Sequence, residues 1–585
     1  MRRRPGTTFL IFLLSIVTFA SFSLYLSRNA ISNWRPYSDL RKLNAITNHL
    51  VLDKKNKNNI VNNNNNNNEF SRQTRRVSSI KETSLSTVSV LIPEWEILVI
   101  VAPNTPLSSD THHCLFPNNA NSRAKFSGVL PFTNRTTFKC DLPESVRRRH
   151  MLPQPMLVTS PTSETEFPSP APELLKWNFL VYESFSTEND IVVFAKGVNH
   201  RNGDDRSPEE LLCVFDIGNG VRKVAVTSSV QEVFRCPHPD PSELDLVSNY
   251  GLPNRIGISL EIVSENIVVP SVAYYIPKPK LMTNALSVQA RPKYFLCACT
   301  MVYNVAKVLR EWVMYHAKVG VENFILYDNA SDDDLYAVID ELRAQGYNIS
   351  TLFWIWPKTQ EAGFSHSVVY SKWKELCSWI MYVDVDEFVF SPSWEHETET
   401  SVVVPSLKTL LAREIIKGGT KVGQVSMRCM EFGPSGQRRH PEEGVTQGYT
   451  CRRRGEQRHK SMVLVEAVDP SLWNVIHHFQ VNERKGFMSK QVSVEEGLVN
   501  HYKYQAWDEF KNKFRRRVSA YVVDWKQEIN PNSKDRTPGL GFQAIEPNDW
   551  THRFCEVRDQ RLKSLTRAWF RSVTPNGYRM AWQRN

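Results

Sequence analysis

Three carboxylates follow a hydrophobic stretch near the middle of the chain. Residues 379–390 read WIMYVDVDEFVF, so β-branched and aromatic residues run into Asp384, Asp386 and Glu387. Such a run predicts a buried strand, and open α/β sheets bind ligands at the carboxyl ends of their strands. In an extended chain Asp384 and Asp386 would share one side, about 7 Å apart. Such paired oxygens suit magnesium or manganese, which can hold a diphosphate, although D-x-D is also common in plain acidic turns.

The preceding segment supplies the elements that would position these carboxylates. Residues 294–300 are strand-like, and 304–318 carry apolar side chains at helical spacing. Gly320 ends that helix, and a second strand at 324–327 leads into a polar turn. The run of three aspartates at 332–334 begins another helix. This order predicts a βαβ unit with a polar crevice at the strand ends.

Several motifs in this region, in this order, resemble the plant members of glycosyltransferase family 92, the group that includes the pectic β-1,4-galactan synthases. The resemblance implies an α/β catalytic domain of the GT-A type, a UDP-sugar donor, a divalent metal (manganese favoured), and transfer with inversion, with galactose as the favoured sugar. The motifs that carry it are EWVMYH (311–316), YDNASDDD (327–334), YVDVDEF (382–388), FGPSG (432–436), RHKSMV (458–463), VIHHF (475–479) and NHYKY (500–504).

The amino terminus predicts a membrane anchor over residues 1–27. Three arginines at 2–4 precede the uncharged apolar stretch 7–26, which is just long enough to span a bilayer as a helix. The alternative is a signal peptide cleaved near Ser21 or Ser23. With the anchor retained, we expect a single-pass type II protein of the Golgi membrane whose catalytic domain is luminal.

The remaining chain divides by composition. Residues 28–88 contain an asparagine run and few apolar clusters, which predicts a disordered stem. Short apolar runs punctuated by Pro, Gly, Asn and Asp predict a β-rich, sandwich-like domain at 89–277. That domain would either bind glycan or serve as a structural module. We expect the GT-A domain at 290–530, followed by a loop and a basic helix at 531–585.

The ten cysteines suit an oxidising lumen. Cys297 and Cys299 lie in a predicted buried strand, where packed thiols are expected rather than zinc ligands, and no C-x-x-C pair exists. Two spacings fit disulfides around hairpin-sized segments, Cys114–Cys140 and Cys213–Cys236.

The donor site is expected to draw on both the turns and the basic residues. Asp328 and Asn329 follow the second strand and are predicted to contact the base and ribose. A basic cluster at 438–460 lies in a span expected to be rich in loops, and Arg458 and Lys460 are the first choices to meet the diphosphate. Asp384 would help to hold both the ribose and the metal.

Metal ligation is expected from Asp384, Asp386 and a histidine. His501 precedes an aromatic helix and is our first choice, His478 is the second, and His477 is expected to be a packed residue. Inversion needs a carboxylate to accept the acceptor hydroxyl proton. The sequence leaves that base open among Glu431, Glu442, Glu443 and Asp508.

The predicted partners are a UDP-sugar, a cell-wall polysaccharide or glycan acceptor and the membrane, and a homodimer is compatible with the sequence. One alternative is a noncatalytic glycan-binding membrane protein. Another is a haloacid-dehalogenase-type phosphatase, which expects Thr or Val where Phe388 stands. The net charge of +11 suggests nucleic-acid binding as a further alternative. The sequence contains no nucleic-acid-binding motif, however, and we expect no such partner.

Overall fold

The computed structural model describes most of the chain beyond residue 86. The described residues are 87–103, 105, 111–149, 151–160, 167–199, 205–217, 220–240, 255–277, 291–395, 406–416, 421–475, 477–518, 546–575 and 577–584. The predicted anchor (1–27) and all but the last two residues of the predicted stem (28–88) lie outside them. Within the described ranges, no helix has the length and apolar character needed to cross a membrane.

The first part of the described chain is β-rich, as the short apolar runs predicted. It begins with a seven-stranded sheet in the order β6-β3-β4-β5-β2-β1-β7. Its strands are β1 (Thr87–Ile92), β2 (Glu96–Val101), β3 (His112–Leu115), β4 (Asn121–Leu130), β5 (Arg135–Asp141), β6 (Met156–Val158) and β7 (Leu175–Lys176), with the short helix α3 (Glu144–Arg147) after β5.

Two further sheets follow and share one apolar core, so this part has the sandwich-like character expected. Ile191 and Val193 of one sheet pack with Phe215 and Ile258 of the other. The first sheet has the order β12-β13-β9-β8 and the second β11-β10-β14-β15, with β16 beside β14. Their strands are β8 (Leu180–Ser186), β9 (Asp190–Lys196), β10 (Leu211–Asp216), β11 (Val221–Ala225), β12 (Ser228–Val230), β13 (Val233–Pro237), β14 (Ile256–Ile262), β15 (Ile267–Val268) and β16 (Tyr274–Tyr275).

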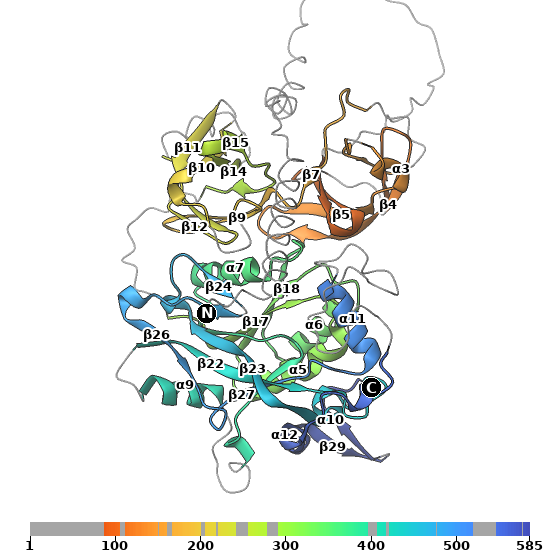
Figure 1. The fold of residues 1–585 in the computed structure, drawn as a ribbon, viewed down its shortest axis with the longest axis vertical. Coiled ribbons are helices and arrows are strands. Elements are labelled where there is room, and N and C mark those ends of the chain that lie inside the picture. The colour runs from red at the N-terminus through yellow and green to blue at the C-terminus, as the bar shows by residue number, and fades with distance from the viewer. Residues whose placement is uncertain are drawn as a thin grey trace, which may run out of the picture. The chain divides into compact units, whose positions relative to one another are not determined.

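The second part is an α/β domain built on one large mixed sheet. Its order is β19-β18-β17-β20-β23-β22-β27-β21, with β26 beside β22 and β28 beside β23. It can be followed in Figure 1 from β17 and β18 in green to β22, β23 and β27 in cyan and blue. The strands are β17 (Tyr294–Val302), β18 (Asn323–Asp328), β19 (Ile349–Phe353), β20 (Cys377–Tyr382), β21 (Glu387–Phe390), β22 (Lys421–Phe432), β23 (Cys451–Leu464), β26 (Phe487–Gln491), β27 (Leu498–His501) and β28 (Val557–Arg558).

Strands β17 to β20 run parallel, as the predicted βαβ unit requires. Alternate residues of β17 face opposite layers. Leu296 and Ala298 belong to the core that also holds α5 and α6, whereas Cys297 and Cys299 belong to the core that holds α7. The helices of the domain are α5 (Ala306–Lys318), α6 (Leu335–Ala344), α7 (Gln360–Trp373), α9 (Leu407–Ile416), α10 (Val445–Gly448), α11 (Trp507–Val518) and α12 (Arg561–Phe570).

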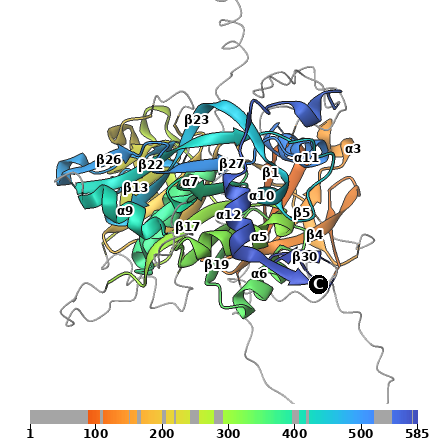
Figure 2. The same cartoon turned by 90° about the horizontal axis from the view of Figure 1, so that it is seen from below.

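The basic cluster at 438–460 was expected to lie in a span rich in loops, and for residues 451–460 this expectation was wrong. They belong to the 14-residue strand β23, although its sequence CRRRGEQRHKSMVL begins with residues of low strand propensity. Pairing with β20 on one side and β22 on the other imposes the extended conformation. Figure 2 shows β23 running beside β22 in the same sheet. The tail was also incompletely predicted, because α12 is followed by the hairpin β29 (Arg571–Thr574) and β30 (Gly577–Met580).

Four disulfides are present. Cys114–Cys140 and Cys213–Cys236 confirm the two predicted pairs. Cys297 is not the packed thiol expected, because it bonds to Cys377 and ties β17 to β20. Cys451 pairs with Cys555.

We predict two free thiols among the ten cysteines, Cys299 and Cys429, both buried. Maleimide labelling of the native, unreduced protein should modify neither, because neither side chain is accessible. Denaturation without reductant should expose both, and peptide mapping should find label at these two positions. Label at Cys297 or Cys377 would instead show that those residues are packed thiols.

Candidate functional site

The three carboxylates do not share one strand: Asp384 and Asp386 lie between β20 and β21, and Glu387 is the first residue of β21. Strand β20 ends at Tyr382, and the backbone N–H of Glu387 donates to the carbonyl of Asp384 at 3.0 Å. The backbone N–H of Asp384 in turn donates to Oε2 of Glu387 at 2.9 Å. The extended alternation predicted for Asp384 and Asp386 is therefore wrong, and Asp386 is only 7% exposed. We call residues 384–387 the acidic turn.

A buried lysine neutralises one side of the acidic turn. In β23, Ser461 pairs with Tyr382 of β20, so Lys460 lies where the turn begins. Its Nζ is 2.9 Å from Oδ2 of Asp384 and 2.9 Å from Oε2 of Glu387. Burial lowers the pKa of Lys460, but the two carboxylates outweigh this effect and hold the pKa above its ordinary value. Lys460 is therefore a fixed positive charge at the turn.

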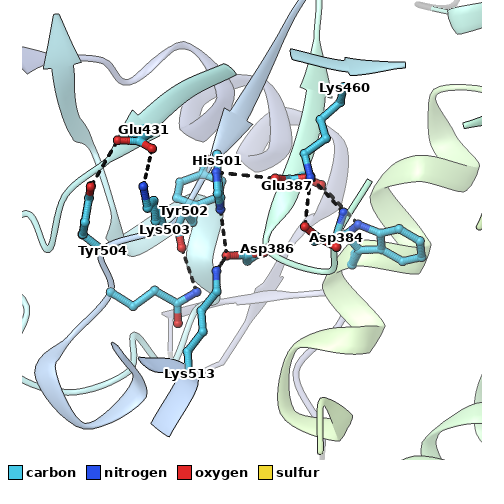
Figure 3. Close-up of polar contacts among 12 residues, drawn as sticks. Asp384, Asp386, Glu387, Glu431, Lys460, His501, Tyr502, Lys503, Tyr504 and Lys513 are labelled. Atoms are coloured by element: carbon cyan, nitrogen blue, oxygen red, sulfur yellow. Dashed lines mark hydrogen bonds and ion pairs between the residues drawn. The ribbon is translucent and has the colours of Figure 1, made fainter. Parts of the chain in front are cut away.

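His501 lies on the other side of the turn, at the end of β27. It pairs with Glu387 in β21 and with Glu431 in β22, so its backbone is held between two strands. Its Nε2 is 3.3 Å from Oδ2 of Asp386, and its Nδ1 is 3.4 Å from Oε1 of Glu387. Figure 3 shows the imidazole between these two carboxylates.

Helix α11 adds a second lysine that the sequence analysis missed. Lys513 contacts Asp386, and Glu509, four residues earlier, pairs with Lys307 of α5 at 2.5 Å. Burial raises the pKa of Asp386, but Lys513 and His501 outweigh it and hold that pKa below its ordinary value. No motif marked Lys513, because its role depends on where α11 packs.

The donor set at the acidic turn fits a divalent cation. Two ligands bonded at right angles to one octahedral ion are about 3 Å apart, close to the 3.3 Å between Asp386 and His501. Asp384 lies beside them, and phosphate oxygens or water would complete the shell. Among the described residues, no group of three or more His, Cys, Asp or Glu side chains forms a ready metal site. The ammonium of Lys513 is already in contact with Asp386.

Side chains of helix α5 form hydrogen bonds to the backbone of β21, the strand that follows the acidic turn. Nε1 of Trp312 donates to the backbone carbonyl of Glu387 at 3.2 Å. The hydroxyl of Tyr315 donates to the carbonyl of Val389 at 2.6 Å. Both rings are fully buried. The helical motif at 311–316 therefore fixes the strand that carries the carboxylates.

Asp328 and Asn329, the predicted base and ribose contacts, are engaged within the protein. Oδ1 of Asp328 accepts from the backbone N–H of Ser331, and Oδ2 accepts from the hydroxyl of Tyr336. Nδ2 of Asn329 donates to the carbonyl of Trp354 at 2.7 Å. Asp328 is 1% exposed. These two residues shape the turn after β18.

The histidines of the VIHHF motif differ in position. Nε2 of His477 is 3.5 Å from Oδ2 of Asp384, and burial with Lys460 lowers its pKa to about 3. His478, our second choice as a ligand, instead contacts Ser461 through Nδ1 and Gln424 through Nε2. Both of its ring nitrogens are thus occupied by other side chains.

Arg458 lies on β23 two residues before Lys460 and is exposed. The pairing of β22 with β23 skips Arg458, since Arg428 pairs with His459 and Cys429 with Gln457. This β-bulge interrupts the alternation of side chains, so the strand register does not place Arg458 on the face of Lys460.

The four candidate bases occupy different surroundings. Glu431 is paired with Arg453 at 3.0 Å and Lys503 at 2.5 Å, and these contacts keep its pKa below the ordinary value although burial raises it. Glu443 accepts from the hydroxyl of Tyr578. Glu442 and Asp508 line a cavity of about 820 Å³ between the starts of α5 and α11.

Comparison with known proteins identifies the family. The sequence model of the family Glycosyltransferase family 92 matches residues 293–537 of the chain. A family 92 protein of Arabidopsis thaliana is 40% identical over 70% of this chain and 69% of its own length. One from Ricinus communis is 36% identical over 85% of both chains. One from Oryza sativa subsp. japonica is 38% identical over 70% of this chain and 68% of its own.

Among solved structures, the matches are distant. Glucosyl-3-phosphoglycerate synthase from Mycobacterium tuberculosis, in complex with Mn2+, UDP and glucosyl-3-phosphoglycerate, is 10% identical, with a TM-score of 0.19. The match covers 39% of this chain and 78% of that one. S. aureus TarS is 13% identical, with a TM-score of 0.20, over 39% of this chain and 65% of that one. Likenesses of this size do not bear on the present fold.

The Lys513 contact predicts competition between its ammonium and a metal ion for Asp386. Lys513→Ala should tighten Mn2+ binding by about two- to fivefold, the equivalent of a partly exposed ion pair worth up to about 1 kcal/mol. Calorimetric titration without nucleotide measures this. Lys511→Ala, on the same helix, is the control for loss of one positive charge and should change the affinity less than about twofold. Unchanged or weaker binding by Lys513→Ala would contradict the competition.

Proposed function

Because the chain belongs to glycosyltransferase family 92, we propose that it transfers a sugar from a UDP-sugar to a hydroxyl of a cell-wall polysaccharide or glycan. Galactose is the favoured sugar, inversion the favoured outcome and manganese the favoured metal, all by resemblance to the pectic galactan synthases. In this proposal, residues 290–530 act as a GT-A-type domain that binds the nucleotide sugar.

The observation that carries the proposal is the charge balance of the acidic turn. Three carboxylates, Asp384, Asp386 and Glu387, face two ammonium groups, those of Lys460 and Lys513. A diphosphate brought to this site would meet an excess of negative charge, which a divalent cation removes. Carboxylates placed here are therefore best explained by a divalent cation, which they would hold beside the diphosphate.

In this proposal Asp386 and His501 would hold the metal, with Asp384 beside them. Lys460, which also balances Asp384 and Glu387, and Arg458 would provide positive charge toward the diphosphate. The metal, when bound, acts as a Lewis acid that stabilises the departing UDP. Asp328 and Asn329 hold the turn after β18 in shape beside the nucleotide.

The base must accept the proton of the acceptor hydroxyl as that oxygen attacks the anomeric carbon. Glu431 is poorly suited, because two cations already neutralise it. Asp508 and Glu442 are exposed and line the same cavity, where an acceptor sugar can reach them. We favour these two over Glu431 and Glu443.

The setting proposed for this activity is the Golgi lumen, with residues 1–27 as a type II anchor. The β-rich part at 89–277 is proposed to bind the glycan acceptor, and a homodimer is compatible with this proposal. The noncatalytic alternative keeps glycan binding but predicts no turnover, and the phosphatase alternative predicts phosphate release from a phosphomonoester. Release of UDP from a UDP-sugar separates both from the proposal.

The direct test is a donor screen with the full chain, a panel of UDP-sugars, galactan oligosaccharides and Mn2+, read as UDP released. We expect turnover, greatest with UDP-galactose, that EDTA abolishes. Asp386→Asn should lower kcat at least about 100-fold, the usual scale for loss of a group that stabilises transition-state charge.

The control for this test is Asp340→Asn. Asp340 is on α6, its side chain is 73% exposed, and it pairs only at the surface with Arg343. Its loss should change kcat less than about twofold. No UDP release from any donor by the folded protein would favour the noncatalytic alternative, and full activity of Asp386→Asn would overturn the metal assignment.

A further inference from the structure

Glu387 is the most buried charged group of the acidic turn. Its side chain is 0% exposed, and its oxygens point to different partners. Oε2 accepts from the backbone N–H of Asp384 at 2.9 Å and lies 2.9 Å from Nζ of Lys460. Burial raises its pKa although Lys460 opposes the effect. A carboxylate is costly in such a place unless its contacts serve a purpose.

The other oxygen, Oε1, is directed at His501. It is 3.4 Å from Nδ1 of that imidazole, and it has no hydrogen-bond partner among the described residues. The contact is thus a close approach of the two groups and not a formed hydrogen bond. An otherwise unsatisfied, fully buried acceptor facing Nδ1 favours the tautomer that carries its proton there.

The opposite nitrogen of the same ring faces the proposed metal position. Nε2 lies 3.3 Å from Asp386, on the side away from Glu387. A histidine can coordinate a metal only through a nitrogen without a proton. Metal-bound histidines commonly donate their other N–H to a carboxylate, which fixes both tautomer and ring orientation.

We propose that Glu387 is a positioning residue for His501: its buried carboxylate accepts a hydrogen bond from Nδ1–H, so that the unprotonated Nε2 is free for the divalent cation. This inference rests on the proposed function, because it assumes that His501 is a ligand. Glu387 is not proposed as a ligand, because its side chain is 0% exposed and its two oxygens face Lys460 and His501.

The strand pairing makes the arrangement rigid. Glu387 of β21 lies opposite His501 of β27, so the two side chains meet across one antiparallel pair. The carbonyl of Glu387 is also bound by Nε1 of Trp312. These contacts fix the two backbones from which the side chains of Glu387 and His501 meet.

The test is a double-mutant cycle on Mn2+ affinity, measured by calorimetry without nucleotide. Glu387→Gln keeps the shape, but its amide can donate to Nδ1 and so force the proton of His501 onto Nε2. We expect Mn2+ affinity to fall about 10- to 100-fold, the usual effect of losing such a partner. His501→Ala should weaken binding at least as much.

The double variant separates positioning from simple loss of charge. If Glu387 acts through His501, adding Glu387→Gln to His501→Ala should weaken Mn2+ binding by less than about threefold further. UDP binding by the metal-free protein should not weaken in Glu387→Gln, because one negative charge has been removed beside the diphosphate. Glu414→Gln, which removes another buried carboxylate, one paired with Lys490, is the control and should retain native Mn2+ affinity.

The outcomes distinguish this inference from the function it rests on. Independent, additive losses in the cycle would overturn the positioning role while leaving His501 as a ligand. A fall of Mn2+ affinity, metal-free UDP affinity and melting temperature together in Glu387→Gln would also overturn it, in favour of a structural role. Native protein that binds no Mn2+ would overturn both the inference and the proposed metal site.

Discussion

The site depends on placing three carboxylates in one four-residue turn, two of them with little access to water. Asp386 and Glu387 are buried, and ionised groups in such surroundings are stable only when paired. The pairing partners come from separate elements: Lys460 from β23, His501 from β27 and Lys513 from α11. Each of these elements must therefore be docked before the turn can hold its charges. Loss of one partner would leave a buried charge uncompensated. The stability of the fold therefore depends on the same ion pairs that form the site.

This requirement explains why residues from motifs far apart in the sequence hold the strands around the acidic turn in position, although they take no part in the reaction. In EWVMYH, Trp312 and Tyr315 bind the backbone of β21. Glu311 accepts from the backbone N–H groups of Val445 and Thr446, although burial raises its pKa to about 7. In FGPSG, the hydroxyl of Ser435 accepts from the backbone N–H of Cys451 at the start of β23. These residues fix the elements that present the charged groups.

The sequence predicted local features well and long-range ones poorly. The βαβ unit, the β-rich region and the placement of Lys460 and His501 near the carboxylates followed from periodicity, strand ends and family motifs. The turn conformation of Asp384 and Asp386 did not, because alternation assumes that the strand continues past Tyr382. Strand β23 was mistaken for loops, since its conformation comes from pairing rather than propensity. Lys513 and the Cys297–Cys377 bond depend on tertiary contacts that no spacing encodes.

The central claim is that the acidic turn holds a divalent cation through Asp386 and His501. The most direct measurement is anomalous diffraction at the manganese edge from crystals grown with Mn2+ and UDP. The account predicts one strong peak within about 2.3 Å of a carboxylate oxygen of Asp386 and of Nε2 of His501, with Lys513 displaced from Asp386. A peak beside His478, or bound UDP with Lys513 still on Asp386 and no peak at the turn, would contradict it.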